Sequence, residues 1–230
     1  YKEMKMVTKV LVGSRLHNLH KEDSDFDYRG IHLHGLKDFL SPFTRSRNTN
    51  WIEGKEDNTS YELAGFCKQA TKGNATILEV FFSDQIIETT PVADKMRNNW
   101  QKFMDTNQFI LASRGYAHNQ YNKMQLFEDE GKLGQSRTPK FAVAYMRVLW
   151  QCARFLETGE FHCQIDEPEW HDYIYETKWN FNYEKVPELT EKFMQLQRRI
   201  TDAQKTAPKM KPDIKWIEEF IYEAYTSDNM

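Results

Sequence analysis

The sequence predicts an α+β protein, in which a small mixed β-sheet with helices is followed by a helical C-terminal domain. In the N-terminal part, short apolar and β-branched runs are separated by turn residues, a pattern typical of strands. From Val92 onward, apolar residues recur at helical spacing and no strong strand pattern appears. We therefore expect two domains, one over residues 1–91 that carries the sheet and a helical one over residues 92–230.

Three strands are expected in the first domain. The apolar run within Lys9–Val12 predicts a buried strand, which Gly13 ends at a close turn. A second strand is predicted over Phe26–Leu33 and a third near Trp51–Thr59.

A helix should follow the third strand. Thr59 and Glu62 have the spacing of a capping box, which predicts a helix that begins at about Ser60. Gly73 stands where this helix would end, because glycine readily adopts the left-handed conformation that closes many helices.

The clearest helix of the chain lies in the second domain. Thr138 and Pro139 supply a cap residue and a first-turn proline, apolar residues follow at helical spacing, and Gly159 marks the end. Later helices are predicted over Pro187–Ala203 and Asp213–Tyr225, with prolines in the connection between them.

Composition indicates a globular, soluble protein with a sizeable core. Of its 230 residues, 40% are hydrophobic and 28% are charged, and no apolar run is long enough to span a membrane. The formal net charge is −3, so the chain lacks the excess of basic residues that strong nucleic-acid binders have. A contact with RNA would therefore have to use a local basic patch. Cys67, Cys152 and Cys163 are odd in number and lack paired spacing, which favours a reducing cytoplasm.

The most informative feature is the acid pair Asp25 and Asp27, which follows the turn Gly13-Ser14 at the end of the first strand. Residues two apart on a strand point to the same face, so the two carboxylates would lie side by side, as magnesium ions require, while Phe26 would pack inward. This arrangement indicates phosphoryl or nucleotidyl transfer.

The turn itself is suited to phosphate. Gly13 permits a close backbone approach, Ser14 offers a hydroxyl and a backbone N–H, and Arg15 offers a forked cation. We expect these three residues to bind the triphosphate of a nucleotide.

This part of the chain resembles the signature of the DNA polymerase β-like nucleotidyltransferase superfamily. The shared features are a Gly-Ser turn after a strand, a spacer, and Asp-x-Asp on the next strand. The longer resemblance is to predicted nucleotidyltransferases grouped with RNA repair ligases in bacteria and phages. It includes SDFDYRGI, the block DNTSYELAGFCKQATKGNATILEVFFS over residues 57–83, and a helical block from Lys140 through Tyr145 and Arg147 to Phe161. The resemblance implies a polymerase β-like nucleotidyltransferase core.

The resemblance also implies a third acidic residue from a neighbouring strand, which acts as general base or completes the metal site. Asp57 is our first choice because it precedes the predicted helix start, and Glu62 is the rival, although capping would already explain it. The implied cofactor is Mg²⁺ or Mn²⁺, held by Asp25, Asp27 and Asp57.

Two basic residues are implied at the triphosphate tail. Lys140 and Arg147 lie seven residues apart, hence on one face of the predicted helix, and similar positions in the family are basic. Cations there would stabilise the pyrophosphate leaving charge, whereas ordinary solvated surface charge is the alternative interpretation.

The implied activity is transfer of a nucleoside monophosphate from a nucleoside triphosphate such as ATP to a hydroxyl acceptor, with release of pyrophosphate. An RNA 3′ end, a protein hydroxyl and a small antibiotic-like alcohol are all chemically compatible acceptors, and the family's genomic associations favour RNA. Two alternatives stay open: a non-catalytic nucleotide-binding or interaction module of the phage–host or toxin–antitoxin type, and a phosphohydrolase that uses the same acids.

Overall fold

The computed structural model describes residues 4–43, 49–53, 56–131 and 137–227, with the backbone alone for residues 49–53, 56, 57 and 128. Two compact units divide the chain. The sheet unit comprises residues 1–105 together with 210–230, and the helical unit comprises residues 106–209. This division differs from the predicted one, because residues 92–105 and 210–230 group with the sheet.

The sheet unit is built on five strands in the order β3-β4-β2-β1-β5. Their bounds are β1 (Lys5–Val12), β2 (Asp27–Leu33), β3 (Thr49–Glu53), β4 (Glu56–Glu62) and β5 (Ile86–Glu88). The pair β2–β4 is parallel and the other three pairs are antiparallel. The predicted α+β fold with a mixed sheet is therefore confirmed.

The region of the third predicted strand differs from the expectation. It forms the antiparallel pair β3–β4 in place of one strand, and the following helix begins at Leu63 rather than near Ser60. Thr59 and Ser60 pair with β2 in the parallel ladder, so tertiary pairing overrides the local capping signal. Glu62 is itself the N-cap, since its carboxylate accepts from the N–H groups of Ala64 and Gly65 at 2.9 Å each.

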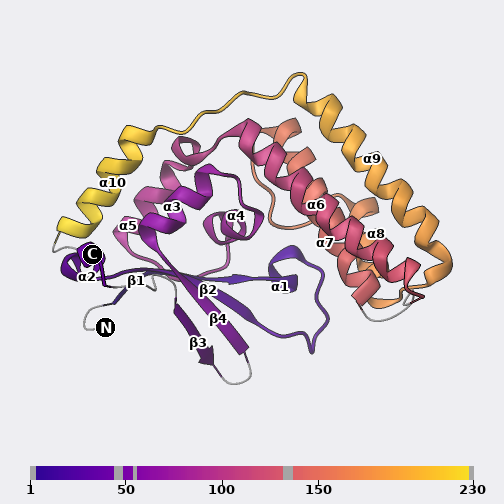
Figure 1. Ribbon diagram of the computed structural model, residues 1–230, viewed down its shortest axis with the longest axis horizontal. Coiled ribbons are helices and arrows are strands. Elements are labelled where there is room, and N and C mark those ends of the chain that lie inside the picture. The colour runs from indigo at the N-terminus through magenta and orange to yellow at the C-terminus, as the bar shows by residue number, and fades with distance from the viewer. Residues whose placement is uncertain (1–3, 44–48, 54–55, 132–136, 228–230) are drawn as a thin grey trace. The chain divides into compact units, whose positions relative to one another are not determined.

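Helices α3 and α4 lie over one face of the sheet (Figure 1). The helices of the sheet unit are α1 (Ser14–His17), α2 (Leu36–Leu40), α3 (Leu63–Thr71), α4 (Ala75–Phe82), α5 (Pro91–Asn98), the 3-10 helix η1 (Trp100–Phe103) and α10 (Ile214–Thr226). Val10 and Ile31 of the sheet and Leu78 of α4 are fully buried, which forms the core beneath these helices.

The C-terminal helix α10 completes the sheet unit. Trp216 and Phe220 place their rings 5.8 and 6.1 Å from the ring of Phe103. The backbone N–H of Asp213 donates to the carbonyl of Lys102 at 2.8 Å. Burial of these rings fixes the end of the chain to the unit in which the chain begins.

The helical unit has its own core. Its described elements are α6 (Thr106–Asp129), α7 (Arg137–Thr158), α8 (Pro168–Trp179), the 3-10 helix η2 (Tyr183–Lys185) and α9 (Val186–Gln204). Tyr145 and Trp150 of α7 are fully buried, and the Tyr145 hydroxyl donates to the Leu189 carbonyl at 2.7 Å. The predicted helices around residues 138–158 and 187–203 are confirmed. Among the helices that the structure describes, none combines the length and the apolar character that a membrane crossing needs.

Candidate active site

The turn after β1 is held by an acid from a distant helix. Gly13 has φ +74°, a conformation that side chains other than glycine rarely adopt. Its N–H donates to Glu79 of α4 at 2.7 Å, and His17 Nε2 lies 2.8 Å from the same carboxylate oxygen. Glu79 thereby ties the turn and helix α1 to α4.

Asp27 lies directly against this turn. A Cβ atom at Gly13 would stand 2.5 Å from Asp27 Oδ2, closer than real atoms approach. Val12 pairs with Asp27 across the antiparallel ladder, which brings the strand end and the carboxylate together. The structure therefore places the second acid of the pair directly against Gly13 of the Gly-Ser turn.

Asp25 is placed differently from the prediction. Strand β2 begins at Asp27, so Asp25 lies in the loop before it and is exposed. Phe26 is 43% exposed and does not pack inward. The predicted alternation fails at Phe26 because the ladder with β1 ends at the pair of Val12 and Asp27, and nothing there holds a strand.

Arg15 braces the loop that carries Asp25. Its guanidinium donates to the carbonyls of Glu22 and Ser24 at 2.9 Å each. It also lies 3.8 Å from the centroid of the Phe26 ring. The donors of Arg15 and the N–H of Gly13 are thus engaged within the protein, while no hydrogen bond of the Ser14 hydroxyl exists among the described residues.

Asn58 is a positioning residue that the sequence analysis missed. Its side chain is fully buried, and its Oδ1 accepts from the Tyr28 N–H at 3.0 Å, which ties β4 to β2 beside Asp27. No local pattern marks such a residue, because its partner is 30 positions away along the chain.

The two candidates for the third acidic residue, Asp57 and Glu62, differ in what the structure shows of them. The backbone of Asp57 lies in β4, paired with Ile52 of β3, and its side chain is outside the described part of the structure. Glu62 is fully buried, caps α3, and also accepts a hydrogen bond from the hydroxyl of Tyr225. These bonds account for Glu62 as a structural residue.

The predicted basic residues belong to the helical unit. Lys140 and Arg147 both lie on α7, two turns apart. Lys140 is exposed, and Arg147 donates to Gln151 at 3.2 Å. They therefore belong to a different unit from Gly13, Asp27 and Glu79.

The acid pair fits a hard divalent cation. Within the described part of the chain, neither Asp25 nor Asp27 has an ion pair or a hydrogen bond to its carboxylate. Carboxylate oxygens are the ligands that Mg²⁺ prefers, and Asp27 beside the glycine turn, with Asp25 two residues before it, offers such oxygens. No group of three potential ligands occurs among the residues searched, which do not include the side chain of Asp57.

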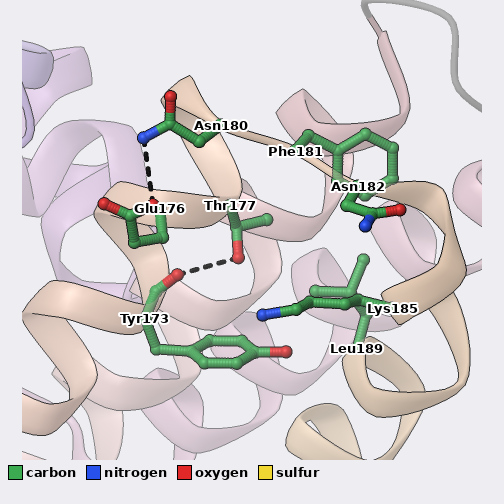
Figure 2. Close-up of a pocket in the computed structure, with 8 residues that line it drawn as sticks. All are labelled: Tyr173, Glu176, Thr177, Asn180, Phe181, Asn182, Lys185 and Leu189. Carbon is green, nitrogen blue, oxygen red and sulfur yellow. Dashed lines mark hydrogen bonds between the residues drawn. The ribbon is translucent and has the colours of Figure 1, made fainter.

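A separate pocket lies in the helical unit, between α8, η2 and α9 (Figure 2). Its volume is about 90 Å³, and Tyr173 and Lys185 line it. Burial, with the negative charge of Glu188, raises the pKa of the Tyr173 phenol, so this group stays neutral. None of the residues predicted for the active site lines this pocket.

Residues 1–222 match the RNA repair pathway DNA polymerase beta family. An uncharacterized protein of Methanocaldococcus jannaschii is 24% identical over 168 residues, which cover 66% of this chain and 60% of that protein. This chain thus spans less than two thirds of that relative. A solved nucleotidyltransferase-like protein from Exiguobacterium sibiricum is similar over 96% of this chain and 73% of its own, with 10% identity and a TM-score of 0.39.

Proposed function

Because this chain belongs to the RNA repair pathway DNA polymerase beta family, we propose that it is a metal-dependent nucleotidyltransferase. It moves a nucleoside monophosphate from a nucleoside triphosphate to a hydroxyl group, and an RNA 3′ end is the acceptor favoured by the family description.

One observation carries this proposal: the carboxylate of Asp27 packs on the left-handed glycine of the Gly-Ser turn. This contact places a metal-ligating acid next to the backbone that a triphosphate would approach. A purely structural turn would have no need for an uncompensated carboxylate at this point, because a charge without a partner adds repulsion and no packing.

Each residue has a role in the proposed reaction. Asp25 and Asp27 hold the divalent cation, which when bound stabilises charge on the phosphates and lowers the pKa of the acceptor hydroxyl. Ser14 donates its hydroxyl to a phosphate oxygen. Asp57 accepts the proton as the acceptor oxygen bonds to the α-phosphorus and the bond to pyrophosphate breaks.

Four further residues support this chemistry. Gly13 contributes the shape of the turn, and Arg15 keeps the loop of Asp25 in place through its contacts. We assign Lys140 and Arg147 to the departing pyrophosphate, as cations that balance its charge. Lys140 is exposed and has no ion pair among the described residues, so its ammonium is available for this role.

The test is a transfer assay with each α-labelled nucleoside triphosphate, Mg²⁺ or Mn²⁺, and total RNA plus protein as acceptors. We expect label in the RNA fraction with the wild type and none with Asp25→Asn or Asp27→Asn. Both variants should fold normally, because removing one of two mutually repelling carboxylates relieves repulsion in the metal-free protein.

Three outcomes would contradict the proposal. Wild-type transfer by either variant would remove the assigned roles of the acids. Release of free nucleoside monophosphate without an acceptor would identify a phosphohydrolase. Metal-dependent nucleotide binding with no label in any fraction would identify a non-catalytic binding module.

A further inference from the structure

A second cavity lies in the sheet unit, between β4, α3 and the start of α4. Its volume is about 480 Å³, within the range of small-molecule sites. The buried side chains of Phe66 and Ile77 line it, as does the half-buried ring of Tyr61. Polar groups of Gln69 and Asn74 complete the lining. A planar ring with polar edges fits this combination of an apolar floor, an aromatic face and amide groups.

The amide groups of this cavity are available to a ligand. Asn74 Oδ1 accepts from the N–H groups of Thr76 and Ile77, as the N-cap of α4, and this leaves the Nδ2 donors unused. The side-chain amide of Gln69 makes no hydrogen bond within the part of the chain that the structure describes. Together the two side chains offer donors and an acceptor to the edge of a ring.

Gly65 provides an independent observation. It lies in α3 and lines the cavity, and a Cβ atom there would meet only Glu62 Oε2, at 3.7 Å, an ordinary contact. Alanine would therefore fit and would favour the helix more than glycine does. Among the described residues nothing explains a glycine here, whereas a ligand that approaches the helix backbone closely would explain it.

The cavity is close to the proposed active site. Thr76, which lines it, and Glu79, which holds Gly13, are three residues apart on α4, so they lie on the same side of the helix about one turn apart. A nucleotide with its phosphates at the Gly13-Ser14 turn can therefore extend along α4 toward the cavity.

We propose that this cavity binds the nucleobase of the incoming nucleoside triphosphate, which stacks on Tyr61 with its edge toward Gln69 and Asn74. The proposal rests on the proposed function for the identity of the ligand. Stacking on an aromatic ring is favourable for every base, so the amide groups provide the selectivity.

The test measures binding and turnover separately. The dissociation constants of the four nucleoside triphosphates with Mg²⁺, and of the four nucleosides without metal, are measured by calorimetry for the wild type, Gly65→Ala, Tyr61→Leu and Asp27→Asn. We expect Gly65→Ala and Tyr61→Leu to weaken both kinds of ligand about tenfold or more. Asp27→Asn should weaken only the triphosphates, and Tyr61→Phe should restore binding because it keeps the aromatic face.

Gly115→Ala is the matched control. Gly115 lies within α6, and a Cβ atom there would meet nothing within 4 Å. Both glycine substitutions should raise the melting temperature, but only Gly65→Ala should weaken binding. A raised melting temperature also shows that a loss of binding by Gly65→Ala is not a loss of folding.

The outcomes separate this proposal from the proposed function. The base site alone would be overturned if the wild type transfers nucleotide while Gly65→Ala and Tyr61→Leu keep the wild-type dissociation constants and KM values for triphosphates. A change in these variants that is confined to the KM for RNA would overturn it as well. Weakened nucleoside binding in these variants, without transfer by the wild type, would support the base site and overturn the transferase. Absence of nucleotide binding by the wild type would overturn both.

Discussion

At the scale of single residues, the candidate site depends on a close contact between Gly13 and Asp27, which leaves no space for a side chain at position 13. Gly13 stands between the carboxylate of Asp27 on one side and the carboxylate of Glu79, which accepts its N–H, on the other. Two acids therefore approach one glycine, one through its Cα and one through its N–H. The first is available to a cation, while the second is occupied by Gly13 and His17.

Replacement of Gly13 by alanine should damage both stability and activity. The new methyl group would stand 2.5 Å from Asp27 Oδ2, and alanine at φ +74° is strained. We expect a loss of about 1–3 kcal/mol in the free energy of unfolding and a loss of nucleotidyl transfer. Urea unfolding and the transfer assay measure the two effects. Full activity in Gly13→Ala would show that the contact with Asp27 is not needed for function.

The sequence predicted some residues of this site and gave no indication of others. Gly13 and Asp27 form a motif whose spacing reflects adjacent strands, so local pattern was sufficient to bring them together. Glu79 and Asn58 act through partners 66 and 30 positions away, and nothing in their immediate neighbourhood indicates these contacts. Asp25 was predicted as a strand residue because alternation alone does not reveal where the ladder ends.

At the scale of elements, local signals gave way where strands pair over long distances. The parallel ladder between β2 and β4 uses Thr59 to Glu62, and therefore delays the helix that their capping pattern suggested. The predicted helix within residues 138–158 contained its own cap, proline and periodic core, and it formed as expected. Strand β5, with three exposed residues, was missed because it is too short to show alternation.

An ion-pair network joins α7, α8 and α9 and predicts a pH effect on stability. Arg199 contacts both Glu157 and Glu167 at 2.8 Å, and Trp150 Nε1 donates to Glu167 at 2.9 Å. Burial alone would raise the pKa of Glu167, but the hydrogen bonds from Arg199 and Trp150 outweigh it and lower the pKa. The stabilisation is therefore present at neutral pH and is lost as the pH falls through the lowered pKa in the folded state.

Replacement of Glu167 by glutamine should cost about 1 kcal/mol at pH 7, since the group is partly exposed. The difference from the wild type should shrink as the pH falls through the lowered pKa of Glu167, because the wild-type carboxylate is then protonated as well. Urea unfolding at pH 7, 5 and 3.5 measures this difference in the free energy of unfolding. Glu169→Gln, an exposed position on the same helix, is the control and should show no difference. A constant penalty for Glu167→Gln at every pH would contradict the assignment.

At the scale of the whole molecule, the sheet unit is discontinuous in sequence. Helix α10 returns to it after the whole helical unit, and its Trp216 and Phe220 complete the aromatic cluster around Phe103. The sequence predicted the helix itself from its periodicity. It did not predict the unit to which the helix belongs, because periodicity shows that a face is apolar and not what covers it.

Removal of residues 210–230 should destabilise the sheet unit and leave the helical unit intact. Loss of the half-buried Trp216 and the buried Phe220 removes about 3 kcal/mol of stabilisation. Hydrogen exchange followed by mass spectrometry measures this, with faster exchange expected in β1 and α3 and unchanged exchange in α7. The full-length double variant Trp216→Ala/Phe220→Ala should show the same pattern. Unchanged protection of β1 in both proteins would contradict the role of α10.

The discontinuity of the sheet unit also has a consequence for biosynthesis. When the ribosome has finished residue 105, every strand has been made, but the aromatic cover of Phe103 has not. The helical unit must then be synthesised in full before α10 emerges, which takes roughly 5 to 20 seconds at the usual rates of translation. The later segment of the chain can therefore fold before the earlier one, and the nascent sheet unit has an exposed apolar surface during this interval that chaperones can bind.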